Sequence, residues 1–415
     1  MSKDEEFVAL MSLDWADKGH RGCIQTRDLV EVEDFQLEQK ASAIQEWAGQ
    51  LRSRFRGGKI AVAVEQKRGP LIYALMKYEM FVIFPLNTTA VKNYRKALRA
   101  SGAKDDPSDA RLQLLFLRNH LDQLRRIEPD STMTRKLRML VEGRRKMVDA
   151  STALSNQITA LLKEYYPTAL ELIGQLKTPL ACDLLSKWPC LQAIKSVKAE
   201  DLKDFYYKRN CRNKQAVELR VKLVSEALPL IDEKGIAATY SFVLRSLVTQ
   251  LQVLLKQVKK YDCRIQKTFN HHRDASLYRS LPAAGPALEP RLAVVFGEDR
   301  NKFDNAAAIA NLMGVSPVTI SSGKYRFVAF RMSAPKFARQ SLVEFAELSI
   351  RQSTWALAYY QKCRNEGKSH NAAVRALAYK WIRIIYRCWK NRLPYDESIY
   401  LAALKRKNVP WLQAS

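Results

Sequence analysis

The N-terminal third of the chain alternates short apolar runs with helical patterns, and this alternation limits the possible folds more than any other feature. Phe7 to Asp14 and Lys59 to Glu65 each predict a buried strand that ends in an acid. His20 to Asp28 and Val30 to Gln36 predict two further strands, joined tightly enough for an antiparallel meander. Met80 to Pro85 predicts another apolar strand. We therefore expect a sheet that combines a meander with strands that alternate with helices.

Helical patterns separate the later strands. Three antiparallel strands followed by alternating helix and strand is the element order of a ribonuclease-H-like α/β domain. In open α/β sheets, chemistry collects at the carboxyl ends of strands, where we expect Asp14 and Glu65. The spacing of apolar residues predicts helices over the ranges Leu37 to Arg56, Leu71 to Tyr78, Asn87 to Arg99 and Ala110 to His120.

The stretch Gly102 to Arg111 places three carboxylates within five residues of an otherwise basic chain. Asp106 and Asp109 are three apart, so they share a face of the helix that they open. Two acids on one face can hold a hard cation such as Mg²⁺. A helix cap is the commoner use of such a pattern, with Asp106 as N-cap and Asp109 in the first turn. The two interpretations are compatible, and Asp105 leaves a register one residue earlier open.

Together with the strand-end acids, this stretch predicts a four-carboxylate site. Such quartets hold two Mg²⁺ ions that stabilise the attacking and leaving oxygens in phosphodiester chemistry. The four expected ligands are Asp14, Glu65, Asp106 and Asp109.

Composition points to a polyanionic partner. The chain carries 69 Lys and Arg against 42 Asp and Glu, a formal charge of +27, which is typical of nucleic-acid binding, with an acidic membrane surface as the alternative. No run reaches the ~18 apolar residues of a membrane span, so we expect no integral membrane protein. Seven cysteines without a C-x-x-C pair are typical of a reducing cytoplasm.

Beyond Pro129 the patterns are helical. Ser131 to Tyr165, Gln215 to Ile231 and Thr239 to Asn270 predict an antiparallel arm with a coiled-coil or dimerising role, and a bundle that packs only on itself fits the periodicity equally well. We expect four segments: an α/β domain over 1–128, a helical arm over 129–275, a mostly helical C-terminal domain over 276–400 and a tail over 401–415.

The C-terminal region contains two candidate phosphate-binding segments. Leu281 to Pro286 resembles the turn of a helix-hairpin-helix, in which backbone N–H groups meet a DNA phosphate. Gly314 to Lys324 predicts a Ser/Gly loop that can present a hydroxyl to a phosphate, although taken alone such a stretch is more commonly an ordinary loop. Pro335 to Gln361 and Asn371 to Lys390 predict helices, whose aromatic residues favour a core over a base-stacking platform.

In this order and spacing, the motifs resemble those of DEDD-type insertion-sequence transposases with a catalytic serine. These are relatives of the Piv DNA invertases and are described as bridge-RNA-guided recombinases. The resemblance covers nearly the whole chain. It rests on Ser12 to Ala16, Ala63 to Glu65, Lys104 to Ala110, Leu281 to Pro286, Gly314 to Pro317, Ser321 to Lys324 and Arg375 to Arg383.

The resemblance implies a resolvase-like nuclease domain with the four acids and Mg²⁺, a coiled-coil middle and a C-terminal serine domain. Ser322 precedes the glycine and is the implied nucleophile, with the adjacent Ser321 as the alternative. Donor and target DNA, a structured guide RNA and a homodimer or homotetramer are the implied partners, in the cytoplasm of a prokaryotic cell and associated with its nucleoid. The nucleic-acid contacts expected around the serine are Lys324, Arg326, Arg331, Lys336 and Arg339.

The sequence departs from the family pattern after the serine loop. Many members carry Lys-Arg-Gly-Asn there, whereas this chain reads Met332 to Arg339, in which Lys336 and Arg339 keep the charge. The expected activity is metal-assisted attack of Ser322 on a DNA phosphodiester, followed by strand exchange. Two alternatives remain: a metal-dependent Holliday-junction-type nuclease without a covalent intermediate, and a non-catalytic nucleic-acid-binding protein.

Overall fold

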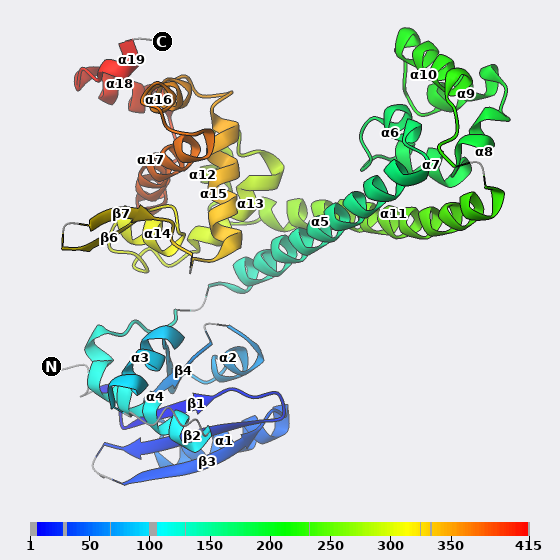
Figure 1. Cartoon of the computed structure of the whole chain (residues 1–415). Helices are drawn as coiled ribbons and strands as arrows, with labels where there is room; N and C mark the ends of the chain where they lie inside the picture. Colours follow the sequence, from blue (N-terminus) through cyan, green and yellow to red (C-terminus); the bar gives the residue numbers. More distant parts are fainter. Residues whose placement is uncertain are drawn as a thin grey trace. The chain divides into compact units, whose positions relative to one another are not determined.

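The computed structural model of the chain describes residues 6–27, 31–66, 68–98, 106–128, 130–231, 233–323, 325–332 and 334–413. The chain divides into two compact units, Met1–Pro129 and Asp130–Ser415 (Figure 1). The first unit is mixed α/β, and the second is mostly helical.

The first unit is built on a five-stranded sheet with the order β3-β2-β1-β4-β5. β1 pairs antiparallel with β2 and β2 antiparallel with β3, whereas β1, β4 and β5 run parallel. The sheet thus combines a meander with a parallel half, as the sequence predicted. Its strands are β1 (Ala9–Asp14), β2 (Gly19–Thr26), β3 (Val32–Glu38), β4 (Ile60–Val64) and β5 (Phe81–Pro85).

Helices cover both faces of this sheet, and the central strand β4 is accordingly apolar on both of its faces. Ile60 and Val62 belong to a core that includes α1 and α2, whereas Ala61 and Ala63 belong to one that includes α3 and α4. The helices are α1 (Ala41–Arg54), α2 (Pro70–Leu75), α3 (Thr88–Leu98) and α4 (Asp106–His120), and a short 3₁₀ turn (Leu121–Gln123) follows α4.

The start of α1 corrects one sequence prediction. We expected a helix from Leu37, but Leu37 and Glu38 continue β3 and pair with His20 and Gly19. Partner strands satisfy the backbone groups of these two residues, so the helix begins only at Ala41.

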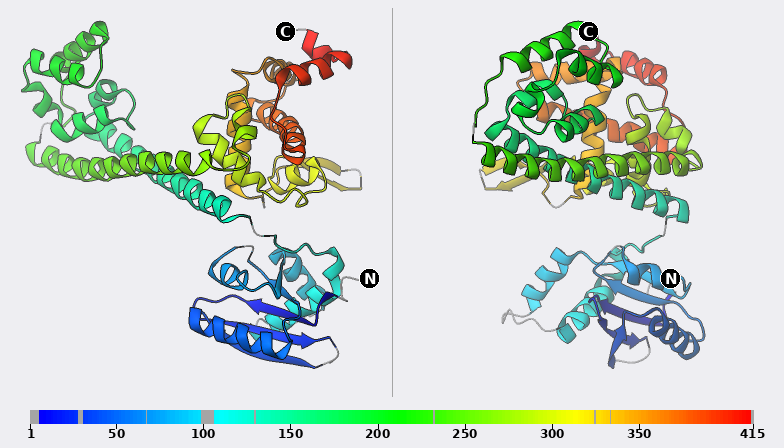
Figure 2. Two further views of the ribbon diagram at one scale, coloured as in Figure 1. Left: turned by 180° about the vertical axis from the view of Figure 1, so that it is seen from behind. Right: turned by 90° about the vertical axis from the view of Figure 1, so that its right-hand side faces the viewer.

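Two long helices form the arm of the second unit. α5 (Thr132–Tyr165) is capped by Ser131, whose hydroxyl accepts from the Thr134 N–H at 3.2 Å. α11 (Lys234–Asn270) runs back alongside α5 in the opposite direction (Figures 1 and 2). An antiparallel pair is therefore observed, and knobs-into-holes coiled-coil packing stays a prediction. Between them the chain forms α6 (Thr168–Ile173), α7 (Pro179–Lys187), α8 (Leu191–Lys195), α9 (Ala199–Lys208) and α10 (Lys214–Glu226).

The second unit has two separate hydrophobic cores. The distal core joins α6 to α10 with the far parts of α5 and α11, including Leu162 and Leu251. The proximal core joins the near parts of the arm, including Leu137 and Phe269, with the C-terminal helices. Those helices are α12 (Ala275–Arg279), α13 (Gly285–Phe296), α14 (Ala306–Leu312), α15 (Lys336–Ser349), α16 (Thr354–Asn365), α17 (His370–Asn391), α18 (Glu397–Arg406) and α19 (Pro410–Gln413).

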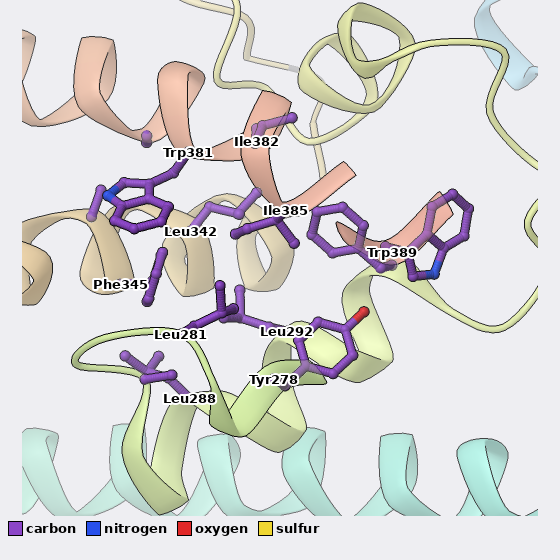
Figure 3. Packing of buried hydrophobic residues seen from close by; sticks show 14 of the residues in the cluster. Tyr278, Leu281, Leu288, Leu292, Leu342, Phe345, Trp381, Ile382, Ile385 and Trp389 are labelled. Carbon is purple, nitrogen blue, oxygen red and sulfur yellow. The ribbon is translucent and has the colours of Figure 1, made fainter. Parts of the chain in front are cut away.

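The two tryptophans of α17 lie inside the proximal core, which confirms the core interpretation for them, whereas Tyr379 is exposed (Figure 3). Trp381 and Trp389 are fully buried, and each indole N–H finds an oxygen at 2.8 Å, Ser349 Oγ and Gly297 O respectively. Buried indoles with satisfied N–H groups pack well but leave no ring face for stacked bases.

Two predictions about the C-terminal half were wrong. The expected single helix from Pro335 to Gln361 is interrupted between α15 and α16, where Glu397 accepts hydrogen bonds from Ser353 Oγ and the Thr354 N–H. The expected serine loop is a hairpin of β6 (Val318–Ser322) and β7 (Tyr325–Ala329). Among the described helices, none combines the length and apolar character that a bilayer crossing needs.

The close approach of β1, β2 and β3 at Gly22 gives a stability prediction. A Cβ on Gly22 would lie 2.6 Å from Ser12 O and 2.5 Å from the Phe35 ring, so Gly22→Ala should destabilise the first unit by about 1–3 kcal/mol. A Cβ on Gly49 in α1 meets nothing, so Gly49→Ala should stabilise it by about 0.5–1 kcal/mol. Hydrogen exchange of the β1 and β2 amides measures the stability change in each variant. Equal exchange in Gly22→Ala and Gly49→Ala would contradict the close backbone approach at Gly22.

Candidate functional site

Asp14 and Glu65 lie at the same edge of the sheet. β1 and β4 are adjacent and parallel, with Leu13 opposite Val64, so their carboxyl ends meet. Asp14 is the last residue of β1, and Glu65 directly follows β4. Both side chains are partly exposed. The structure therefore brings these two predicted site residues together.

Gln113 of α4 connects the two acids. Its Nε2 donates to Asp14 Oδ1 at 3.3 Å and to Glu65 Oε1 at 3.5 Å. Because one amide nitrogen reaches both carboxylates, the two acids are close neighbours. The Gln113 side chain is 1% exposed, and its Oε1 has no hydrogen-bond partner among the described atoms. A buried amide oxygen without a partner carries a desolvation cost.

α4 is fixed to the sheet directly above this edge. Ser12 of β1 donates its hydroxyl to Ala110 O at 2.6 Å, in the buried interior. Ser12 also lies 3.2 Å from the Cys23 thiol, and burial raises the pKa of Cys23 to about 11. Cys23 therefore stays a neutral thiol at physiological pH and serves packing, and the Ser12 bond holds the helix register.

The two acids of α4 are placed differently. Asp109 is buried and forms an ion pair with Arg95 of α3. Asp106 is the first residue of α4, but its side chain, like all of Asp105, lies outside what the structure describes. Within the described residues, no group of three Asp, Glu, His or Cys side chains is arranged to hold a metal. The convergence of all four acids therefore stays a prediction.

Gln113 is a site residue that sequence reasoning missed. It lies four residues after Asp109, on the same helix face, so the signal was present in the spacing. A search of the sequence for carboxylates does not consider a neutral amide, although amide oxygens are also hard metal ligands. The carboxylate oxygens of Asp14 and Glu65 are of the type that a hard divalent cation prefers.

The predicted serines lie on the exposed hairpin of the second unit, which projects from the helices (Figures 1 and 2). Ser321 is opposite Arg326, and Ser322 is opposite Tyr325. Directly opposed residues share a face of the ribbon, so Ser321 lies with Arg326 and Ser322 lies with Tyr325 and Phe327. Ser321, Ser322 and Arg326 are exposed.

The other predicted nucleic-acid contacts lie near the hairpin, except for Lys324, which falls outside the described residues. Arg339 donates to Arg331 O at 3.1 Å, and its guanidinium lies 4.5 Å from the centre of the Phe330 ring. Lys336 is exposed at the first position of α15. Arg339 thus anchors the base of the hairpin, whereas Arg326 and Lys336 are accessible.

Comparison with known proteins matches both ends of the chain. Residues 11–167 match the DEDD transposases of IS110-type elements, and residues 275–361 match the transposases of the IS116/IS110/IS902 family. The chain belongs to the IS110/IS116/IS902 transposases. It is thus related to DNA strand-transfer enzymes, and a DEDD domain implies dependence on a divalent metal.

Individual relatives span most of this transposase. It is 28% identical, over 86% of its length and 85% of the relative, to a protein assigned as the transposase of the IS117 mini-circle of Streptomyces coelicolor. It is 23% identical, over 95% of its length and 97% of the relative, to a 43.6 kDa protein of insertion element IS110 from the same species. A 42 kDa protein of IS900 from Mycobacterium paratuberculosis is 26% identical over 55% of this chain and 57% of its own length.

The Gln113 contacts predict a loss of metal affinity. Gln113→Leu removes the amide that holds Asp14 and Glu65 together, so Mn²⁺ affinity should fall roughly 10- to 100-fold, as for other groups that orient metal ligands. Isothermal titration of the full chain measures this. Asn119→Leu is the control, because Asn119 lies on the same helix but donates to Tyr94 Oη. Equal affinities in both variants would show that Gln113 has only a packing role.

Proposed function

We propose that this transposase cuts and rejoins DNA strands through Ser322, assisted by Mg²⁺ bound to Asp14, Glu65, Asp106 and Asp109. The observation that carries the proposal is the meeting of Asp14 and Glu65 around Gln113 at the carboxyl edge of β1 and β4. The strand order β3-β2-β1-β4-β5, with α4 across the sheet, supports a ribonuclease-H-like, resolvase-like nuclease domain.

A divalent ion at these acids would polarise the scissile phosphate and favour ionisation of a hydroxyl. The protein's own groups have separate tasks. Asp14 and Glu65 supply negative oxygens, and Gln113 keeps them at one spacing. Arg95 neutralises Asp109, so a metal ligated by Asp109 has to compete with this ion pair. Ser12 fixes α4 so that Gln113 stays in reach of both acids.

The covalent step conserves the phosphoester bond. Ser322 Oγ attacks the phosphorus atom, the bond to one sugar oxygen breaks, and that oxygen leaves as a hydroxyl with the serine's proton. A sugar hydroxyl of the partner strand then attacks the phosphoserine and returns the proton to Ser322. No external energy is required, since each step exchanges one phosphodiester for another.

The hairpin register separates the two candidate serines. Ser322 shares its face with Tyr325 and Phe327, whereas Ser321 shares its face with Arg326. Only one face of the ribbon can meet a given phosphate, so the two serines cannot replace one another without turning the ribbon. We assign Ser322 as the nucleophile because the family pattern that this chain resembles places the nucleophile immediately before the glycine, with Ser321 as the alternative.

A metal-dependent Holliday-junction-type nuclease is the second candidate function. It is favoured by the fact that Asp14, Glu65, Asp109 and Gln113 all belong to the first unit, so water could replace the serine there. In that case the hairpin only contacts phosphate.

A guide RNA and a homodimer or homotetramer complete the proposal. The charge of +27 suits two nucleic acids at once. Large apolar side chains are exposed at the distal end of the arm, which supports self-association there. These are Leu219, Leu228, Leu230, Phe242 and Val253.

Ser322→Ala tests the covalent mechanism directly. With Mg²⁺, co-expressed RNA and labelled DNA, the unchanged protein should give a protein-sized shift of DNA on denaturing gels, and Ser322→Ala should abolish both adduct and cleavage. Ser321→Ala is the matched control and should retain the adduct. Cleavage that persists in Ser322→Ala without an adduct would favour the nuclease instead.

Asp14→Asn tests the carboxylate site. Removing one negative charge from the pair held by Gln113 should weaken Mn²⁺ binding and reduce DNA cleavage by at least about 100-fold, because a metal ligand is lost. Asp17→Asn, on the exposed loop after β1, is the control. Unchanged cleavage and metal affinity in Asp14→Asn would eliminate metal-assisted chemistry at this edge.

A further inference from the structure

The ribbon of β6 and β7 exposes two aromatic rings to solvent (Figures 1 and 2). Tyr325 is 83% exposed and Phe327 is 56% exposed. Phe330, just beyond the ribbon, is held differently, because the guanidinium groups of Arg339 and Arg375 lie 4.5 and 5.6 Å from the centre of its ring. Phe330 therefore belongs to the base of the ribbon, whereas Tyr325 and Phe327 leave most of their surface to water.

The strand register places both rings on one face together with Ser322. Ser322 is directly opposite Tyr325, and Ile320 is directly opposite Phe327. Side chains alternate between the two faces of a ribbon, so these four residues share one face and Val328 lies on the other. Directly opposed residues have Cβ atoms about 4.5–5.5 Å apart. The Ser322 hydroxyl therefore lies beside the Tyr325 ring.

The charge around these rings is entirely basic. The chain has no Asp or Glu between Asp304 and Glu344, a stretch that contains the whole ribbon. Rings interleaved with basic residues on an exposed surface are typical of proteins that stack the bases of single-stranded nucleic acid. The stretch carries five basic residues, which are Lys324, Arg326, Arg331, Lys336 and Arg339.

The spacing of the rings suits unpaired bases. Tyr325 and Phe327 are two residues apart on one strand, which separates their side chains by about 6.6–6.8 Å. This is about twice the 3.4 Å rise of a stacked nucleic-acid strand, so each ring can hold a base without a collision between the two. The faces of bases inside a duplex are covered by their neighbours, so only unpaired bases can reach the rings.

The same charge argues against a second copy of the chain as the occupant of this face. Two ribbons that met face to face would bring two basic stretches together, and like charges in an interface repel one another. A nucleic acid instead supplies phosphates for the basic residues and flat apolar bases for the rings. It therefore satisfies both features of the surface at once.

We propose that Tyr325 and Phe327 stack on unpaired bases of the DNA strand beside the phosphate that Ser322 attacks. This assignment rests on the proposed function. Strand exchange requires unpaired bases at the cut, because a strand leaves one duplex and joins another. A base stacked on Tyr325 keeps the neighbouring phosphate next to Ser322 Oγ. The two rings contact bases and not the reacting atoms, so they are positioning residues.

The test replaces both rings with an aliphatic side chain that keeps the ribbon apolar. Tyr325→Leu combined with Phe327→Leu removes the stacking surface at exposed positions, so the proximal core is not altered. Tyr325→Phe combined with Phe327→Tyr keeps two rings and should restore binding. Val328→Ala is the control, because Val328 is exposed on the opposite face of the same ribbon.

Binding of the full chain to labelled single-stranded DNA, and to a blunt duplex of the same length, should be measured by fluorescence anisotropy over a range of salt. Stacking contributes roughly 5- to 100-fold in Kd per base, so the double leucine variant should bind single-stranded DNA at least about 5-fold more weakly. The slope of log K against log salt should not change, because stacking releases no counter-ions. Duplex binding should be the same in all variants.

Four results overturn the proposal. They are unchanged affinity of the double leucine variant for single-stranded DNA, an equal loss with the blunt duplex, an equal loss in Val328→Ala, and failure of the exchanged rings to restore binding. Sedimentation velocity and binding to single-stranded RNA and to phosphatidylserine vesicles follow on the same variants. An effect confined to oligomeric state, RNA or vesicles would assign the face to a second copy, a guide RNA or an acidic membrane instead.

The binding assay is independent of strand cleavage. Weaker single-stranded DNA binding by the double leucine variant, in a protein that forms no serine adduct, would reject the recombination mechanism and keep the stacking surface. An adduct that depends on Ser322, with single-stranded DNA affinity unaffected by loss of both rings, would keep the mechanism and reject the stacking surface.

Discussion

Parallel pairing of β1 with β4 is the constraint on which the candidate chemistry depends. Two strands that are distant in sequence end side by side, so Asp14 and Glu65 face the same space without any special loop. Like charges at such spacing repel one another, and the amide of Gln113, which donates to both acids, offsets part of this repulsion. Gln113 leaves the net negative charge intact, which a cation site requires. The hydroxyl of Ser12 fixes α4 against β1 and so keeps Gln113 within reach of the two acids.

The division of functional groups between two units has an equally physical basis. Carboxylates need a rigid edge with a defined spacing, and a buried sheet provides it. The serine proposed as nucleophile needs exposure to approach DNA, and the two-stranded ribbon of β6 and β7 provides that. Apolar side chains such as Tyr325 and Phe327 stay exposed on it, at a cost that a nucleic-acid or protein surface would recover on binding.

Much of this organisation could be predicted from the sequence, because it follows from local pattern. Alternating apolar runs located the five strands, and the strand-end positions of Asp14 and Glu65 followed from them. Contacts between distant residues could not be predicted. Leu37 is a strand residue because of His20, and the interruption before Thr354 depends on Glu397. The partnership of Asp109 with Arg95 is likewise invisible in sequence, since either residue could equally face solvent.

The neck of the arm has a mechanical consequence. Between the proximal and distal cores, α5 and α11 are packed mainly on each other, and small residues such as Ser151 and Ser155 are buried there. About 20 residues of α5, roughly 30 Å at 1.5 Å per residue, separate Arg145 from Tyr165. A bend of about 10° at the neck would therefore carry the distal core through roughly 5 Å. Two packed helices resist bending less than a larger bundle does, so a bend of the second unit costs least at this neck.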